Sequence, residues 1–209
     1  AALEQVIFQI GITAFLILVA YYGTEAYAAY GIGVQILSFS FVIGFGFSIA
    51  GATLVGQHLG AKNKNQAKRA GWGAMRLSIV SMTFFGVIIA TFAEPLARFM
   101  IDNDEVVRLT VIFIWLLGSM QPLMAIEFSL GGALRGAGDT KTPLAITLTC
   151  LLFIRVFLAV IFFLLDASIE IIFSTLLADY IVKGFLYVSR FRSDKWMNVL
   201  KIKEVDQQP

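Results

Sequence analysis

Long apolar blocks alternate with short polar interruptions along the whole chain. Each block reaches the roughly 20 apolar residues that a helix needs to cross a lipid bilayer. The interruptions are rich in glycine, charged residues and helix-capping residues, which end one helix and begin the next. The pattern therefore predicts six membrane-spanning helices, at about 3–22, 27–57, 72–92, 107–133, 144–165 and 169–189.

The apolar blocks suit helices and not the strands of a membrane barrel. Such strands alternate lipid-facing and interior-facing residues over about ten positions, whereas these blocks are continuously apolar. A helix satisfies its own backbone hydrogen bonds and can therefore lie in lipid. Composition agrees, because 58% of the 209 residues are hydrophobic and only 14% are charged, with a mean hydropathy of +0.82. The sequence predicts an all-α membrane protein, with the lipid bilayer as its first partner.

Basic residues gather on alternate interruptions. One set holds twelve Lys or Arg and four acidic residues, in segments 58–76, 134–143 and 190–209. The other set holds two basic and seven acidic residues, in segments 21–27, 94–108 and 165–170. Basic loops stay in the cytoplasm. We therefore expect a multi-pass protein of the plasma membrane, with a transmembrane lobe at 1–189, a basic tail at 190–209 and both ends of the chain cytoplasmic.

The second block carries small residues at every fourth position, namely Gly44, Ser48, Ala52, Gly56 and Gly60. Small residues at this spacing make a smooth stripe along which another helix can approach closely. Two interpretations stay open. The stripe either provides tight packing alone or lets helices slide and rock against one another.

Ionisable residues inside membrane spans are costly and mark candidate sites. Asp179 and Lys183 are spaced one helical turn apart and are expected to form a structural pair. Arg155, in the middle of the fifth block, either neutralises a carboxylate or lines an aqueous cavity. Glu4 and Glu127 have no basic residue nearby in sequence. A low dielectric disfavours the charged form of a carboxylate, so both are candidates to bind a proton or a coupling cation. For Glu127 a hydrogen bond between helices is the rival interpretation.

Several classes of function are excluded or lack support. The net charge of +2 gives no reason to expect nucleic acid as a partner, and a single cysteine, Cys150, excludes an intrachain disulfide and a multi-cysteine metal site. The glycines after Leu134 do not form a phosphate loop, because the G-x-x-x-x-G-K-[ST] spacing and a preceding strand are both lacking. The sequence shows no catalytic triad and no metal-binding cluster, so we expect neither an enzyme nor a bound metal.

Two motifs carry a family resemblance. LRGAGDTKTPL at 134–144 and GFGFSIAGATLVGQHLGAKNKNQAKRA at 44–70 closely resemble signatures of the multidrug and toxic compound extrusion (MATE) family, and LEQVIFQIG near the start resembles that family's seventh helix. The resemblance implies a fragment, the C-terminal six-helix lobe of a twelve-helix antiporter, with an N-terminal six-helix lobe as its partner. It also implies export of organic cations and other small amphipathic substrates, with inward Na⁺ or H⁺ as the coupling ion and no other cofactor.

The resemblance is carried to individual residues where they match. It implies that Glu4 matches the seventh-helix acid, which binds the coupling cation in several branches. One branch has an Asp on its tenth helix where this chain has Met124, and Glu127, about one turn nearer the cytoplasm, is a candidate substitute. A further branch keeps its essential acid on the first helix of the other lobe, which leaves the coupling ion open. Gln9, Gln35 and the aromatic residues of the first two blocks are candidates for the cavity lining.

The signature loop has its own expected roles. Gly136 and Gly138 are expected to end one helix and to permit left-handed backbone. Asp139 and Thr140 can cap the next helix, whose first turn suits Pro143. Arg135 and Lys141 are expected to hold the loop in the cytosol. The loop is thus predicted to be a turn and a topological anchor that need not contact substrate.

Two alternative functions stay open. The first is a flippase for lipid-linked glycans within the same superfamily, whose cavity should be strongly basic to hold a diphosphate. The second is a non-transporting half-protein that acts as a partner subunit.

Overall fold

The protein is described by a computed structural model that covers the backbone of residues 2–199; side chains are described for Val6 and from Gln9 onward. Helices make up nearly all of this part, and no strand occurs in it. The helical segments are α1 (Ala2–Tyr21), α2 (Thr24–Gly60), α3 (Lys64–Thr91), α4 (Ala93–Met100), α5 (Asp104–Ser119), α6 (Gln121–Gly136), α7 (Lys141–Thr149), the π-helix η1 (Cys150–Val156), α8 (Phe157–Leu164), α9 (Ile169–Arg192) and the 3₁₀-helix η2 (Lys195–Asn198). The predicted all-α class is confirmed.

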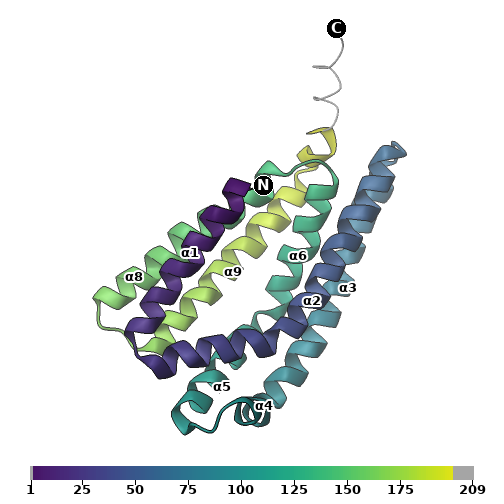
Figure 1. The fold of residues 1–209 in the computed structure, drawn as a ribbon. Coiled ribbons are helices and arrows are strands. Elements are labelled where there is room, and N and C mark those ends of the chain that lie inside the picture. Colours follow the sequence, from purple (N-terminus) through teal and green to yellow (C-terminus); the bar gives the residue numbers. More distant parts are fainter. Residues whose placement is uncertain (1, 200–209) are drawn as a thin grey trace.

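Four helical segments are long and apolar enough to cross a membrane: α2, α3, the continuous run α7–η1–α8, and α9. The pair α5–α6, bent by 53°, is together long and apolar enough for a fifth span, and the apolar part of α1, Gln9–Tyr21, is shorter than a full span. The six predicted ranges fall on these segments and on α1. They are arranged up and down, so that successive connections lie at opposite ends of the molecule (Figure 1).

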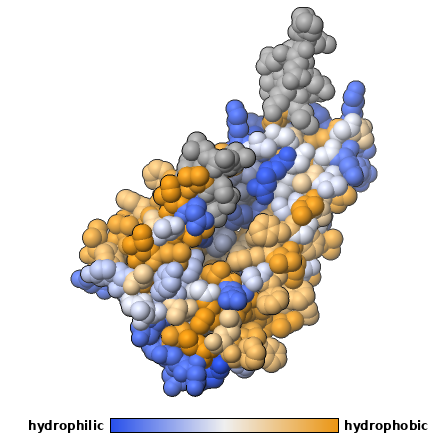
Figure 2. All heavy atoms as spheres, viewed as in Figure 1, coloured by the Kyte–Doolittle hydropathy of each residue, from blue (hydrophilic) through white to orange (hydrophobic). Residues whose placement is uncertain are grey.

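The surface between these two ends is apolar. Figure 2 shows hydrophobic residues over the sides of the helices, with hydrophilic residues gathered toward both ends. Large side chains such as Phe39, Phe84, Val42 and Phe185 are more than half exposed. Apolar surface of this extent indicates contact with lipid or with another protein surface and not with water.

The fourth predicted span is not one straight helix. It divides at Met120 into α5 and α6, and Pro122 lies in the first turn of α6. Proline lacks the backbone N–H that would continue the ladder of hydrogen bonds from the preceding turn. The prediction of a single helix over 107–133 was therefore wrong in this respect.

The other differences concern lengths and short elements. Helix α2 has 37 residues, against 31 predicted, and Figure 1 shows it changing direction along its course. The interruption at 94–105 contains the short helix α4, in which Arg98 pairs with Glu94 and with Asp104 of α5, each at 2.9 Å. These pairs close the end of the molecule opposite the signature loop.

The folded lobe continues beyond residue 189, where the tail was predicted to begin. Helix α9 runs to Arg192, and Trp196 of η2 is fully buried. The Trp196 ring stacks on Phe191 at 4.6 Å between centroids, and its indole N–H donates to the Phe191 carbonyl at 2.9 Å. Phe191 in turn meets Trp72 of α3 edge to face. The contacts among Trp72, Phe191 and Trp196 thus pack the first part of the tail against the lobe.

Two hydrophobic cores fill the interior. The larger one joins α1, α2, α3, α5, α6 and the first half of α9, and it includes Phe15, Phe113, Met124 and Phe173. The smaller one lies toward the signature loop, and it includes Val55, Leu134, Cys150 and Phe191. Helices α6 and α9 pass through both cores.

Candidate functional site

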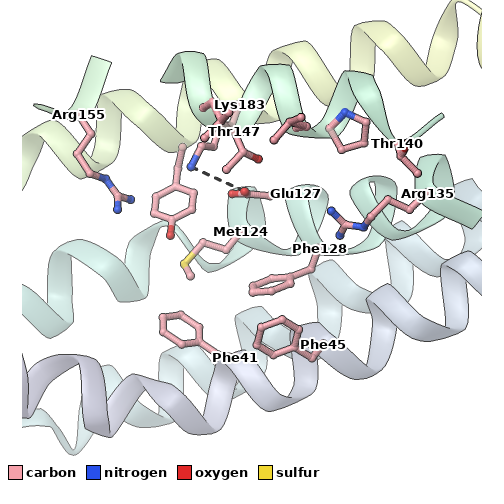
Figure 3. Close-up of a pocket in the computed structure, with 14 residues that line it drawn as sticks. Phe41, Phe45, Met124, Glu127, Phe128, Arg135, Thr140, Thr147, Arg155 and Lys183 are labelled. Carbon is pink, nitrogen blue, oxygen red and sulfur yellow. Dashed lines mark ion pairs between the residues drawn. The ribbon is translucent and has the colours of Figure 1, made fainter. Parts of the chain in front are cut away.

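A cavity of about 730 Å³ opens between α2, α6, α7, η1 and α9. Figure 3 shows two unlike walls: Phe41 and Phe45 of α2 with Phe128 of α6 on one side, and the charged side chains on the other. The charged residues of the lining are Glu127, Arg135, Arg155 and Lys183. The site therefore combines an aromatic surface with several ionic groups, as expected for a binder of amphipathic molecules.

Four charged residues form a connected layer behind and along this cavity. Asp179 Oδ2 lies 2.9 Å from the Arg155 guanidinium and 3.0 Å from Lys183 Nζ. Lys183 Nζ also lies 3.7 Å from Glu127 Oε1. Asp179 is fully buried, and the Arg155 and Lys183 side chains are less than a tenth exposed. Buried charges in such an arrangement depend on one another, because removing one leaves its partner uncompensated.

The layer lies between the two hydrophobic cores on every helix that contributes to it. On α9, Leu176 belongs to the larger core and Tyr187 to the smaller one, with Asp179 and Lys183 between them. On α6, Glu127 lies between Met124 and Leu130, which belong to the larger and the smaller core respectively. The charged layer is thus a polar level that separates two apolar ones.

Arg155 is positioned by an irregular helix. It lies in η1, where the backbone hydrogen bonds run from residue i+5 to i in place of i+4. Its guanidinium also lies over the Tyr180 ring, 5.6 Å from the centroid. The two sequence interpretations of Arg155 both describe what is seen, since it neutralises Asp179 and lines the cavity.

Glu127 finds its basic partner on another helix. It has no basic neighbour in sequence, yet the fold brings Lys183 of α9 within 3.7 Å. Glu127 is the most accessible member of the charged layer, with its side chain 20% exposed. It lies in the cavity one helical turn from Met124 (Figure 3). The partner comes from another helix, because α6 and α9 pack together at this level, and a role of Glu127 in binding a proton or cation stays a prediction.

The signature loop is tied to the end of α9. Asp139 Oδ1 accepts from the backbone N–H of Thr142 at 3.3 Å and from its hydroxyl at 2.8 Å, which caps the start of α7. Thr140 occupies the cap position but makes no capping side-chain hydrogen bond. Gly138 has a φ of 82°, the left-handed conformation expected of it. Arg190 donates to Asp139 Oδ2 at 2.6 Å.

Part of this loop also lines the cavity. Arg135, Thr140 and Pro143 all contribute to it (Figure 3). The Pro143 carbonyl accepts from the Tyr187 hydroxyl at 3.3 Å, and Thr147 lies 3.2 Å from the same hydroxyl. The loop is thus more than a connection, since it forms one end of the candidate site.

The small residues of α2 permit close contact with α6. A Cβ built on Gly132 would collide with the Ser48 carbonyl, and one on Gly136 with the Ala52 carbonyl. A Cβ on Gly44 would overlap the Phe128 ring. Helices that approach this closely need glycine at the point of contact. The stripe therefore serves tight packing; whether it also allows sliding stays a prediction.

The remaining sequence candidates lie elsewhere. Gln9 is exposed on α1 in a shallow groove with Ile10 and Ile17, away from the main cavity. Gln35 is exposed on α2 and is absent from the cavity lining. Glu4 belongs to α1, but its side chain lies outside the described residues. No group of three or more His, Cys, Asp or Glu side chains that could hold a metal occurs in the described part.

Sequence reasoning missed several lining residues. Thr147 lies in an apolar stretch, and Tyr180, although next to Asp179, carries no charge that would single it out. Phe41 and Phe45, in contrast, belong to the aromatic residues of the second block that were candidates for the lining, and their spacing of one helical turn places them on one face of α2. What it could not reveal is that this face meets α6 and the charged layer.

Comparisons with known proteins agree with this architecture. The protein-family model described as MatE matches residues 1–161. The Thermotoga maritima protein named "Probable multidrug resistance protein NorM" is 34% identical over 204 residues, which are 93% of this chain and 42% of that protein. The protein of the same name from Mannheimia succiniciproducens is 31% identical over 128 residues, which are 61% of this chain and 28% of that protein. This chain spans less than half the length of these relatives.

Solved structures show the same fold. A MOP superfamily transporter from Pyrococcus furiosus superposes with a TM-score of 0.81 at 17% identity, over 94% of this chain and 42% of that one. A multidrug resistance MATE family transporter in an outward-facing conformation gives a TM-score of 0.76 at 19% identity, over 95% and 43%. The helical lobe with its intramembrane cavity is of the membrane-transporter class. The chain belongs to the MATE family, whose members are transporters and not enzymes.

Proposed function

We propose that this chain works as the C-terminal lobe of a secondary-active exporter of amphipathic xenobiotics, organic cations among them. The transporter alternates between inward-open and outward-open states, and an N-terminal six-helix lobe supplies the other half of the pathway. Inward flow of Na⁺ or H⁺ drives it. Family membership and a span of 42% of the T. maritima relative support the assignment to one lobe of two.

The observation that carries the proposal is the cavity with its aromatic wall and its layer of charge. Ionisable residues at membrane depth are rare and usually belong to ion or substrate pathways. Aromatic side chains bind diverse apolar bodies, because dispersion and burial impose few geometric demands. A site of this kind suits a transporter that accepts several amphipathic compounds.

Glu127 is the described residue best placed for coupling. A proton or Na⁺ that reaches it through the cavity would compete with Lys183 for the same carboxylate, because the two lie only 3.7 Å apart. Lys183 would keep Asp179 as its counter-charge at 3.0 Å. An ion bound in one state and released in the other shifts the equilibrium between them by its difference in affinity. Glu4 remains the second candidate, from the family resemblance.

The membrane orientation belongs to the same proposal. The signature loop and the start of α3 lie at the same end of the molecule, and this end holds most of the basic residues. We place that end in the cytoplasm of a plasma-membrane protein, by the preference of basic loops for the inner side.

A glycan flippase is the second candidate, because Arg135, Arg155 and Lys183 all line the cavity. Two of these bases are already matched by Asp179 and Glu127. The positive charge that is left is small for a diphosphate, which carries at least two negative charges. The exporter therefore stands as the better supported function.

The test uses the full-length protein in cells that lack their own efflux systems. Ethidium accumulation is measured for the native protein and for Glu127→Gln and Glu4→Gln, with Glu25→Gln as control, since Glu25 is exposed at the start of α2. We expect the native protein and the control to lower accumulation, and at least one of the other two variants to lose most of this effect. Collapsing the proton and Na⁺ gradients separately identifies the coupling ion. Export by neither native protein nor control, despite correct insertion, would contradict the proposal.

A further inference from the structure

The charges around the cavity do not balance. Three basic side chains line it, Arg135, Arg155 and Lys183, and Glu127 is the one acidic residue of the lining. Asp179, buried behind the wall, pairs with two of the bases. The described groups therefore leave one positive charge in excess. Such an excess attracts an anionic group that enters the cavity and repels a cationic one.

Arg135 carries this excess. It has no carboxylate within ion-pair distance in the described part of the chain, and its side-chain hydrogen bond is a long one of 3.4 Å to the Ser48 hydroxyl. Asp139, four residues further on, is engaged by Arg190 at 2.6 Å. Figure 3 shows the Arg135 guanidinium directed toward the cavity, near Phe128 and Glu127.

A second donor in the same cavity also lacks a partner. Arg155 is 8% exposed, and its Nε makes no hydrogen bond with any described group. A buried donor of this kind is rare in proteins and is costly to leave without an acceptor. This Nε is itself buried, so Arg155 adds charge to the wall of the cavity and Arg135 is the cationic donor that a ligand can reach.

We infer that this cavity holds an amphiphile by an acidic group, such as a carboxylate, sulfonate or phosphate, which binds Arg135 while the apolar body packs against Phe41, Phe45 and Phe128. Arginine suits this role because its planar fork donates two parallel hydrogen bonds to an oxyanion. The inference rests on the proposed transport function and narrows its substrate class.

The simpler alternative is that Arg135 is only a topological anchor at the cytoplasmic end of α6. An anchor interacts with water and lipid head groups. Its loss would therefore change the binding of acidic and uncharged ligands to the same extent. The two possibilities therefore differ in how binding depends on the charge of the ligand.

The test compares two probes that differ by one acidic group, anilinonaphthalene sulfonate and its uncharged parent phenylnaphthylamine. Binding to the purified full-length protein in phosphatidylcholine nanodiscs is measured by equilibrium dialysis, with empty nanodiscs subtracted. We expect the sulfonate to bind about tenfold more tightly than the parent, as one charge-assisted hydrogen-bond pair would give. Arg135→Gln should remove this preference without changing the affinity for the parent, and Arg135→Lys should keep part of it. Arg192→Gln, at the exposed end of α9, is the control and should keep it in full.

Equal affinities of the two probes for the native protein would overturn the inference, as would a preference that survives Arg135→Gln. Repeating the measurement in nanodiscs with phosphatidylglycerol identifies the source of the ligand: loss of sulfonate binding there shows that an anionic lipid occupies the site, and unchanged binding shows a ligand from solution. The ethidium measurement is independent. Efflux of ethidium without a preference for the sulfonate leaves the exporter standing and removes this inference alone.

Discussion

Arg190 and Asp139 join the signature loop to the end of α9 by two hydrogen bonds, from Nε at 2.8 Å and from Nη2 at 2.6 Å to the same carboxylate oxygen. The Asp139 side chain is only 5% exposed, and its other oxygen caps α7. One carboxylate thus fixes the start of one helix and the end of another. Among the loop residues singled out in the sequence, Asp139 makes the most side-chain hydrogen bonds, and it accepts them through both of its carboxylate oxygens.

Replacement of Asp139 should therefore destabilise the lobe. We expect Asp139→Ala to lower the free energy of unfolding by about 3 kcal/mol, because it removes the cap and leaves Arg190 without its partner. The measurement is thermal unfolding of the full-length protein in detergent. Lys68→Gln is the control: it breaks the more exposed Lys68–Asp194 pair, which should be worth less than about 1 kcal/mol. Equal losses for the two variants would contradict the role given to Asp139.

The contact between α2 and α6 makes a second prediction. Gly132→Ala should destabilise the protein by about 2 kcal/mol, because the added methyl group meets the Ser48 backbone and the two helices must move apart. Gly46→Ala is the matched control in the same membrane region, since a Cβ there meets nothing within 4 Å. Yield of monodisperse protein and its melting temperature report both changes. A well-tolerated Gly132→Ala would show that the interface is looser than described.

The charged layer can be tested by a double-mutant cycle. Asp179→Asn leaves Arg155 and Lys183 buried with too little negative charge, and we expect a loss of about 3 kcal/mol or more. Arg155→Gln should also be destabilising. The double variant should be clearly more stable than the sum of the two losses predicts, because the residues compensate one another. Additive losses would mean that the two side chains do not interact.

Trp196 provides a fourth prediction. Trp196→Ala should lower stability by about 3 kcal/mol, since a fully buried indole leaves a cavity and Phe191 loses its stacking partner. Lys195→Ala, on the exposed neighbouring residue, should change stability by less than about 0.5 kcal/mol. The melting temperature of each variant of the full-length protein measures the change. If both variants melt at the native temperature, η2 is not part of the folded lobe.

The hydropathy of the chain was sufficient for the helical class, because crossing a bilayer leaves few alternatives to a continuous apolar helix. The same signal could not reveal the break at Met120, where the residues on both sides remain apolar and only Pro122 hints at a bend. Nor could it reveal η1, because a π-helix differs from an α-helix in its hydrogen bonding and not in its composition. Local sequence thus predicted the spans and left their irregularities undetermined.

The charged layer of the candidate site was predictable in its members and not in its connections. Ionisable residues inside apolar blocks are conspicuous, which is why Glu127, Arg155, Asp179 and Lys183 could all be singled out. The spacing of Asp179 and Lys183 also indicated their contact, since it is fixed by one helical turn. Arg155 with Asp179 and Glu127 with Lys183 are contacts between helices far apart in sequence, which no local pattern encodes.

The position of the charged layer between the two cores has a consequence for how the lobe can move. Sliding α9 along α6 by one turn, about 5.4 Å, would bring Asp179 or Lys183 level with Leu130 or Met124, against apolar side chains of one core or the other. The same holds for Arg155 between Cys150 and Ala159. The layer therefore fixes the relative heights of three helices, and we expect a change between inward-open and outward-open states to carry α6, η1 and α9 together as one unit.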